Sequence, residues 1–257
     1  MLFNKKKYDF IFSLGEACSS TEALRDNNLQ IISNPLDWIG GPTLEERINF
    51  ILNDFEDFLN IEDLESLNRT NGVVDFPCDI YLNKKNKFVF NHDFPTGIKL
   101  ENSFNKVKEK YNRRIKRLYE KINEAKKVLV VYIEVPFNED KLKDNNRLID
   151  GLEKLKTKFP NTKFDFLYVI NDTSFKPLKY KKEIVTDEIT KISGNYNRLD
   201  ESLPIHVVNY KFFKKILRNY KLNLPNSYYI KKLAIQLYIK FIPNRDTRTK
   251  LRKKYHV

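Results

Sequence analysis

Two long apolar runs separated by a helical pattern constrain the fold more than any other feature. Residues 128–135 are nearly all apolar, as a strand buried on both faces requires, and residues 164–170 form a second such run. Residues 145–159, between them, have helical spacing. Because a crossover joins a strand, a helix and a second strand in this order, the pattern predicts an α/β fold with a mostly parallel sheet flanked by helices.

The first half of the chain adds a strand, a helix and a hairpin to this scheme. Residues 8–14 predict a strand that ends at Gly15, and the helical composition that follows places Cys18 in the first turn of a helix. Two strand-like runs around the polar turn at residues 83–86 predict a β-hairpin insertion whose far end carries His92.

Two further signals complete the expected domain. Thr43 and Glu46 have the spacing of a helix capping box, and residues 205–208 predict another strand. No linker rich in glycine, serine or proline divides the chain. We therefore expect a single catalytic-like α/β domain over residues 1–224, followed by an amphipathic helix and a basic tail over residues 225–257.

Composition excludes several classes of protein. Hydrophobic residues make up 41% of the 257 residues, which is ordinary for a globular core. No apolar run of about 18 residues is present to span a bilayer, and no signal peptide precedes the first strand, so we expect a cytoplasmic protein. Cys18 and Cys78 lack the spacing of a disulfide framework, and the three histidines are far apart in sequence, so we expect no metal site.

The net charge of +13 either attracts an anionic partner, such as nucleic acid, an anionic lipid surface, a nucleotide-like cosubstrate or an acidic glycan, or reflects lysines scattered over solvated helix faces. The basic residues come without a nucleic-acid recognition fold, so we expect no specific nucleic-acid partner. A helix that carries Ile230, Leu233, Leu237 and Phe241 precedes the basic tail. Such a helix either contacts an anionic inner membrane peripherally, at about 1 kcal/mol per basic residue, or docks on the core.

Cys18 is the first candidate for chemistry. At the start of a helix, unpaired N–H groups and the positive end of the helix dipole stabilise a thiolate, although a cysteine there is also a common small core residue. A thiolate needs a base, and His92, beside Asp93, is the best placed of three histidines. His206 lies inside an apolar strand pattern and His256 lies in the tail, so both rank lower.

Four ordered blocks in the first half of the chain carry a resemblance to a known family. They are FSLGEAC at 12–18, NPLDW at 34–38, DIY at 79–81 with FNHDFP at 90–95, and a helix with paired arginines at 111–118. Together they resemble a bacterial family of unsettled function described as papain-like cysteine peptidases. Beyond Val131 the likeness is thin.

The resemblance implies roles for individual residues. Cys18 would be the nucleophile and His92 its base, and the residue that orients the base would be Asp93, Glu134, or the pair Asn171 and Asp172. The residues expected to line or brace the substrate site are Ser13, Gly15, Asp37, Trp38, Arg113 and Arg114. Alternatives stay open at this stage, because a lone tryptophan also anchors cores and arginine pairs also occur as exposed helix charges.

The resulting hypothesis is a cysteine-dependent acyl transfer reaction. Similarity to some capsule acetyltransferases favours acyl-CoA as a cosubstrate, with no tightly bound cofactor, and a sugar hydroxyl of a capsular or lipopolysaccharide glycan as the acceptor. A papain-like peptidase or amidase with the same centre is the first alternative. A non-catalytic module that binds a glycan or a nucleotide sugar is the second, and it requires that Cys18 titrate as an ordinary thiol.

Overall fold

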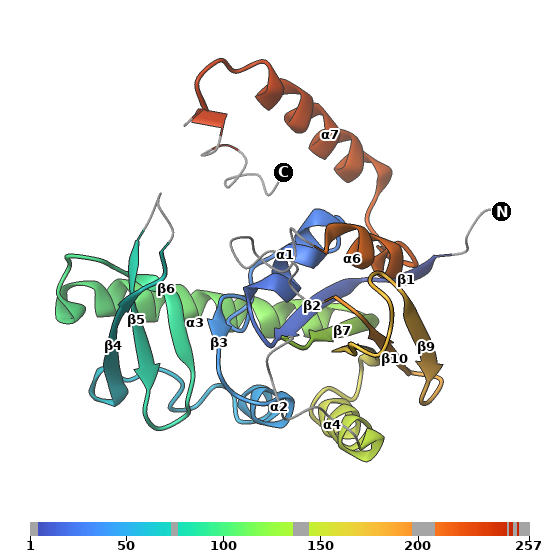
Figure 1. Ribbon diagram of the computed structural model, residues 1–257, viewed down its shortest axis with the longest axis horizontal. Coiled ribbons are helices and arrows are strands. Elements are labelled where there is room, and N and C mark those ends of the chain that lie inside the picture. Colours follow the sequence, from blue (N-terminus) through green and yellow to red (C-terminus); the bar gives the residue numbers. More distant parts are fainter. Residues whose placement is uncertain are drawn as a thin grey trace.

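A computed structural model describes residues 5–72, 77–135, 144–196, 209–245, 247–248 and 251. Its centre is a five-stranded sheet, which helices cover on both faces (Figure 1). The strand order is β2 (Phe10–Gly15), β7 (Lys127–Ile133), β8 (Lys163–Asn171), β10 (Ile189–Gly194) and β9 (Tyr180–Ile184). The first four strands are parallel and β9 is antiparallel. The expected α/β class is confirmed, with a mixed sheet that includes parallel strands.

The alternation of side chains along β7 explains why both faces are covered. Val128 and Val130 belong to one apolar cluster, and Leu129 and Val131 belong to another. Successive side chains of a strand point to opposite faces, so an uninterrupted apolar strand needs helices on each side. Helices α1 (Cys18–Asp26) and α6 (Tyr210–Leu217) cover one face; α2 (Leu44–Leu52), α3 (Leu100–Glu124) and α4 (Asn145–Lys158) contribute to the cluster on the other.

A second sheet lies beside the first and carries His92 (Figure 1). Its strands, all antiparallel, follow the order β3 (Ile39–Gly40), β6 (Val89–Pro95), β5 (Cys78–Asn83) and β4 (Leu64–Thr70). Phenylalanines of this sheet pack on α3 within the same core as the first sheet. We expected two of these strands; β4 escaped notice because most of its side chains are exposed and lack an apolar period.

The remaining elements are a short strand pair, a 3₁₀ turn and a long helix near the carboxyl-terminal end of the described chain. Strands β1 (Lys6–Tyr8) and β11 (Tyr220–Leu222) pair in parallel, and a 3₁₀ turn (Ile61–Asp63) precedes β4. Helix α7 (Asn226–Lys240) follows β11. The predicted capping box of α2 is confirmed. The predicted strand at 205–208, His206 and His256 lie outside the described residues. Among the described helices, none combines the length and apolar character that crossing a bilayer requires.

Candidate functional site

Cys18 is the first residue of α1, at the carboxyl end of β2. The turn before it depends on Gly15, which has a φ of +104°. A Cβ atom at Gly15 would lie 2.5 Å from Nη1 of Arg47, so only glycine fits this turn. No side chain caps the amino-terminal end of α1, and the backbone N–H groups of Cys18 and Ser19 act on the thiol. The thiol therefore lies at a helix start that no side chain caps, and this position in the first turn of a helix is the one that the sequence predicted.

The electrostatic balance at Cys18 differs from the expectation. Burial raises the pKa of the Cys18 thiol, and the nearby Glu22 carboxylate raises it further. The backbone N–H groups of Cys18 and Ser19 lower the pKa, but they do not outweigh the first two effects. The expected net stabilisation of the thiolate by the helix start is therefore wrong for this state, because a partly buried sulfur loses more hydration than two N–H groups return.

His92 lies on an irregular part of β6. Tyr81 of β5 pairs with Phe90, whereas Asp79 pairs with Phe94, so β6 contains extra residues between the two pairs. His92 lies within this bulge, and its ring meets Trp38 edge-on with 6.1 Å between the ring centroids. Bulges re-aim side chains away from the regular pleat and are frequent beside active sites.

Asn71 holds the imidazole of His92, and sequence analysis did not single it out. Its Nδ2 lies 3.3 Å from Nδ1 of His92 and donates to the carbonyl of Asn91 at 2.8 Å. Its Oδ1 accepts from the backbone N–H of Cys78 at 3.2 Å, which fixes the orientation of the amide. From this pattern we assign Nδ1 of His92 as the acceptor and Nε2 as the protonated nitrogen of the neutral ring.

The surroundings of His92 favour its neutral form. Burial lowers the pKa of His92, the Asp93 carboxylate raises it, and the Lys110 ammonium lowers it. Its contacts are with Trp38 and Asn71, and within the described part of the chain no hydrogen bond joins it to Cys18. The raised pKa of Cys18 and the lowered pKa of His92 both favour the neutral forms of the two side chains in this state.

A path of contacts nevertheless connects the two residues. Cys18, Glu22 and Arg25 are spaced by four and three positions, so they share one face of α1. Arg25 pairs with Glu22 at 3.0 Å, and its guanidinium lies 4.9 Å from the centroid of the Trp38 ring. Trp38 then contacts His92. The cysteine face of α1 and the bulge of β6 are thus the two walls against which Trp38 packs.

Asp37 braces the loop that presents Trp38. Its side chain is fully buried, and its Oδ1 accepts from Thr21 Oγ1 of α1 at 2.8 Å. Its Oδ2 accepts from Gln30 Nε2 and from the backbone N–H of Asn34, each at 2.8 Å. Burial raises the pKa of Asp37 to about 7, against the opposing effects of these donors and of nearby arginines. Both carboxylate oxygens of Asp37 accept hydrogen bonds from other parts of the protein, so the side chain holds the loop before Trp38 in place.

The candidates for the orienting residue have other partners. Asp93 accepts from Lys110 and from Tyr111 Oη, and Glu134 accepts from Tyr168 Oη. The Oδ1 of Asn171 accepts from the backbone N–H of Tyr196 at 3.0 Å. Asp172 accepts from the N–H and hydroxyl of Ser174 in a turn. The residue whose side chain reaches His92 is Asn71.

The substrate-site candidates divide into buried and accessible residues. Ser13 is fully buried, and its Oγ accepts from Gly15 N–H at 2.9 Å, so these two residues shape the turn before Cys18. Arg113 is exposed, 4.0 Å from Glu109. Arg114 instead turns inward over the Tyr111 ring, and its Nη1 is buried with no hydrogen-bond partner among the described residues.

Arg47 is a structural residue that sequence analysis missed. It is fully buried and donates to the carbonyls of Leu14 at 2.8 Å, Glu16 at 2.9 Å, Ile39 at 3.2 Å and Pro42 at 2.8 Å. One guanidinium thus fastens the turn before Cys18 to the strand after Trp38. In the described ranges no group of three or more His, Cys, Asp and Glu side chains is arranged to hold a metal ion.

A comparison with known protein families agrees with the resemblance that the four sequence blocks at 12–18, 34–38, 79–95 and 111–118 indicated. Residues 9–174, more than half of the chain, match the family described as "putative papain-like cysteine peptidase". The match continues well past Val131, where the resemblance seen in the sequence was thin, and ends before α6 and α7. No curated protein and no solved structure matches the chain. The chain therefore belongs to the family that carries this description, and its Cys18, Asn71 and His92 all lie within the matching region.

Proposed function

We propose that the protein is a cysteine-dependent enzyme that forms an S-acyl intermediate on Cys18, with His92 as the base. The observation that carries this proposal is the position of Cys18 at the open start of α1, on the face that leads through Arg25 and Trp38 to a neutral His92. A neutral imidazole is the form that accepts a proton. Hydrogen bonds between catalytic groups are often long before substrate binds, so we propose that the pair closes around the substrate.

The proposed reaction has two halves. Cys18 sulfur bonds to the carbonyl carbon of an amide, ester or thioester as its proton passes to His92, and N–H groups of the first turn of α1 hold the oxyanion. The carbonyl bond to the amine, alcohol or thiol then breaks, and the leaving group takes the proton from His92. Water or an acceptor hydroxyl next attacks the S-acyl group and loses a proton to His92, which returns it to the sulfur.

Arg114 is our candidate for binding an anionic group of the substrate. Its buried Nη1 has an unused donor, and a planar guanidinium suits a carboxylate or a phosphate. It lies close enough to Asp37, the neighbour of Trp38, to lower the pKa of that carboxyl group. Arg113, one residue earlier and exposed, provides a matched control because it is of the same type on the same helix.

Amide hydrolysis is the first candidate reaction, because the family description concerns peptidases. Acyl transfer to a capsular or lipopolysaccharide sugar, with acyl-CoA as the donor, is the second. The inward Arg114 supports it, because the phosphates of coenzyme A need a cationic site. A small-molecule or glycan acceptor would enter from the same side, and we propose action at the cytoplasmic face of the membrane.

The experiment compares two substrate panels on one set of variants. Purified protein is incubated with a peptide library or with acyl-CoA and oligosaccharides, and products are identified by mass spectrometry. We expect turnover in one panel, its loss in Cys18→Ala, and a rise in KM of about tenfold in Arg114→Gln with little change in Arg113→Gln. Turnover that survives Cys18→Ala, or equal effects of the two arginine variants, would contradict the proposal.

A further inference from the structure

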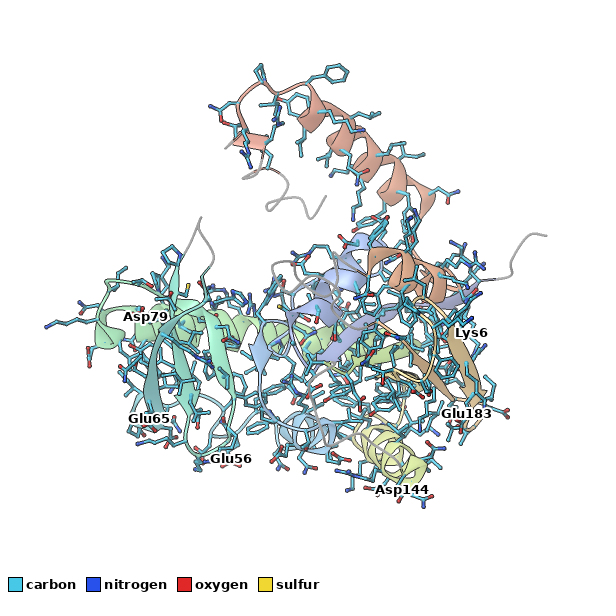
Figure 2. All side chains as sticks on the ribbon, in the orientation of Figure 1. Lys6, Glu56, Glu65, Asp79, Asp144 and Glu183 are labelled. Carbon is cyan, nitrogen blue, oxygen red and sulfur yellow. The ribbon has the colours of Figure 1, made fainter. Side chains whose placement is uncertain are left out.

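Helix α7 exposes more large apolar side chains than any comparable described stretch. It projects from the rest of the fold beyond α1 and α6, and its side chains stand clear of both sheets (Figure 2). A single residue of the helix, Ile239, is fully buried. From the helix to its C-cap residue, the large apolar side chains with 47–84% of their surface exposed are Ile230, Leu233, Leu237, Tyr238 and Phe241. A folded domain rarely leaves such a continuous apolar surface without a partner.

The exposed residues form one stripe and the inner residues form another. Ile230, Leu233 and Leu237 are spaced by three and four positions, as one helical face requires. Ile239 and Lys232 lie on the opposite face, where burial and the nearby Arg25 of α1 lower the pKa of Lys232. The helix therefore has an inner face on which Ile239 is buried and Lys232 is partly buried, and an outer apolar face that is exposed.

The charges around the outer face indicate which kind of partner it would bind. At 3.6 residues per turn, Lys231 and Lys240 fall on opposite sides of the apolar stripe, and both are exposed. Residues 226–245 contain four basic residues and no acidic residue, and the sequence continues with further arginines and lysines to Lys254. A protein partner of ordinary composition does not require this one-sided charge, whereas an anionic lipid surface does.

We propose that the outer face of α7 binds an anionic lipid bilayer, lying in the headgroup region with its apolar stripe against the acyl chains. Lys231 and Lys240 flank the stripe as residues that snorkel to phosphate groups do. This proposal does not rest on the reaction at Cys18.

Vesicle flotation tests the proposal with the full chain. Vesicles of phosphatidylcholine alone are compared with vesicles that also contain phosphatidylglycerol. We expect binding that requires phosphatidylglycerol, weakens with salt, and falls about tenfold or more in Leu233→Ser/Leu237→Ser. The control is Ile184→Ser on β9, whose side chain is 56% exposed and far from α7 in sequence, and it should bind as the wild type does.

Lysine variants and the oligomeric state complete the test. Lys231→Gln/Lys240→Gln should weaken binding at low salt and reduce its salt dependence. Failure of the wild type to float with anionic vesicles would overturn the proposal. A stable dimer in size-exclusion chromatography with light scattering, lost in Leu233→Ser/Leu237→Ser, would also overturn it, because a second copy of the chain would then cover the outer face.

Discussion

The surroundings of Cys18 and the outer face of α7 are opposite kinds of surface. Around Cys18, two charged groups are buried and hydrogen-bonded: Arg47 donates to four carbonyls, and Asp37 accepts hydrogen bonds on both oxygens. On α7, large apolar groups are exposed and have no such partners. A buried polar network specifies one geometry because each lost partner is costly, whereas an exposed apolar stripe gains stability only when something covers it. The first region is therefore preorganised, whereas the second gains stability only when it binds to another surface.

The largest expected effect is on Arg47. Arg47→Ala removes donors from four buried carbonyls and leaves a cavity, so we expect the free energy of unfolding to fall by about 4 kcal/mol or more. Urea denaturation measures this change. Lys116→Ala, which is exposed on α3, is the control and should change stability by less than about 0.5 kcal/mol. A small effect at Arg47 would remove the distinction between the two regions.

The next effect is a pH dependence carried by Asp37. Its folded-state pKa is about 7, whereas an unfolded aspartate titrates near pH 4, so between these values the folded state binds more protons. Its contribution to stability is therefore lost as the pH rises, by at most about 1.4 kcal/mol per pH unit.

Asp37→Asn should flatten this dependence in urea denaturation across that pH range. The comparison of variant with wild type also separates Asp37 from His92, whose lowered pKa contributes the opposite slope. Identical slopes in the two proteins would show that Asp37 is ionised in the folded state throughout the range.

A smaller effect is expected at Glu22. Its carboxylate raises the pKa of Cys18, and its removal also frees the positive charge of Arg25. Glu22→Gln should therefore speed alkylation of Cys18 by about threefold at neutral pH, which iodoacetamide labelling and peptide mapping would measure. Slower labelling would mean that the Glu22 and Arg25 pair positions the cysteine rather than suppressing its thiolate.

The smallest effect is expected on α7. Without lipid, Leu233→Ser/Leu237→Ser should alter the free energy of unfolding by less than about 0.5 kcal/mol, because both side chains are about half exposed or more. The same urea denaturation applies. A loss of several kcal/mol would show that the outer face is part of the folded core of the protein in solution.

Much of the fold could be predicted, because the central strands and the long helices carry strong apolar periods. The uninterrupted apolar run of β7 and the apolar stripe of α3 are local signals that can be read in the sequence. Strand β4 and the pairing of β9 with β10 carry no such period, so only tertiary contacts define them.

The residues of the candidate site also divide into those that could be predicted and those that could not. Cys18 and His92 were predicted from a local turn and from family motifs, and their catalytic roles stay predictions. Asn71 and Arg47 could not be predicted, because the bonds that tie them to the site, from Asn71 to His92 and from Arg47 to the turn before Cys18, join residues at least 21 positions apart. The sequence alone does not indicate which carbonyl or ring nitrogen an asparagine or arginine will bond to after folding.

The most direct test of the central claim is acylation of Cys18 by p-nitrophenyl acetate, followed by intact-protein mass spectrometry and peptide mapping in a Cys78→Ser background. We predict one acetyl group on Cys18, acquired about 100-fold more slowly in His92→Ala and several-fold more slowly in Asn71→Ala. Acetylation of Cys18 at the same rate in all three proteins, or none at Cys18 in any of them, would contradict the assignment of Cys18 and His92 to one reactive centre.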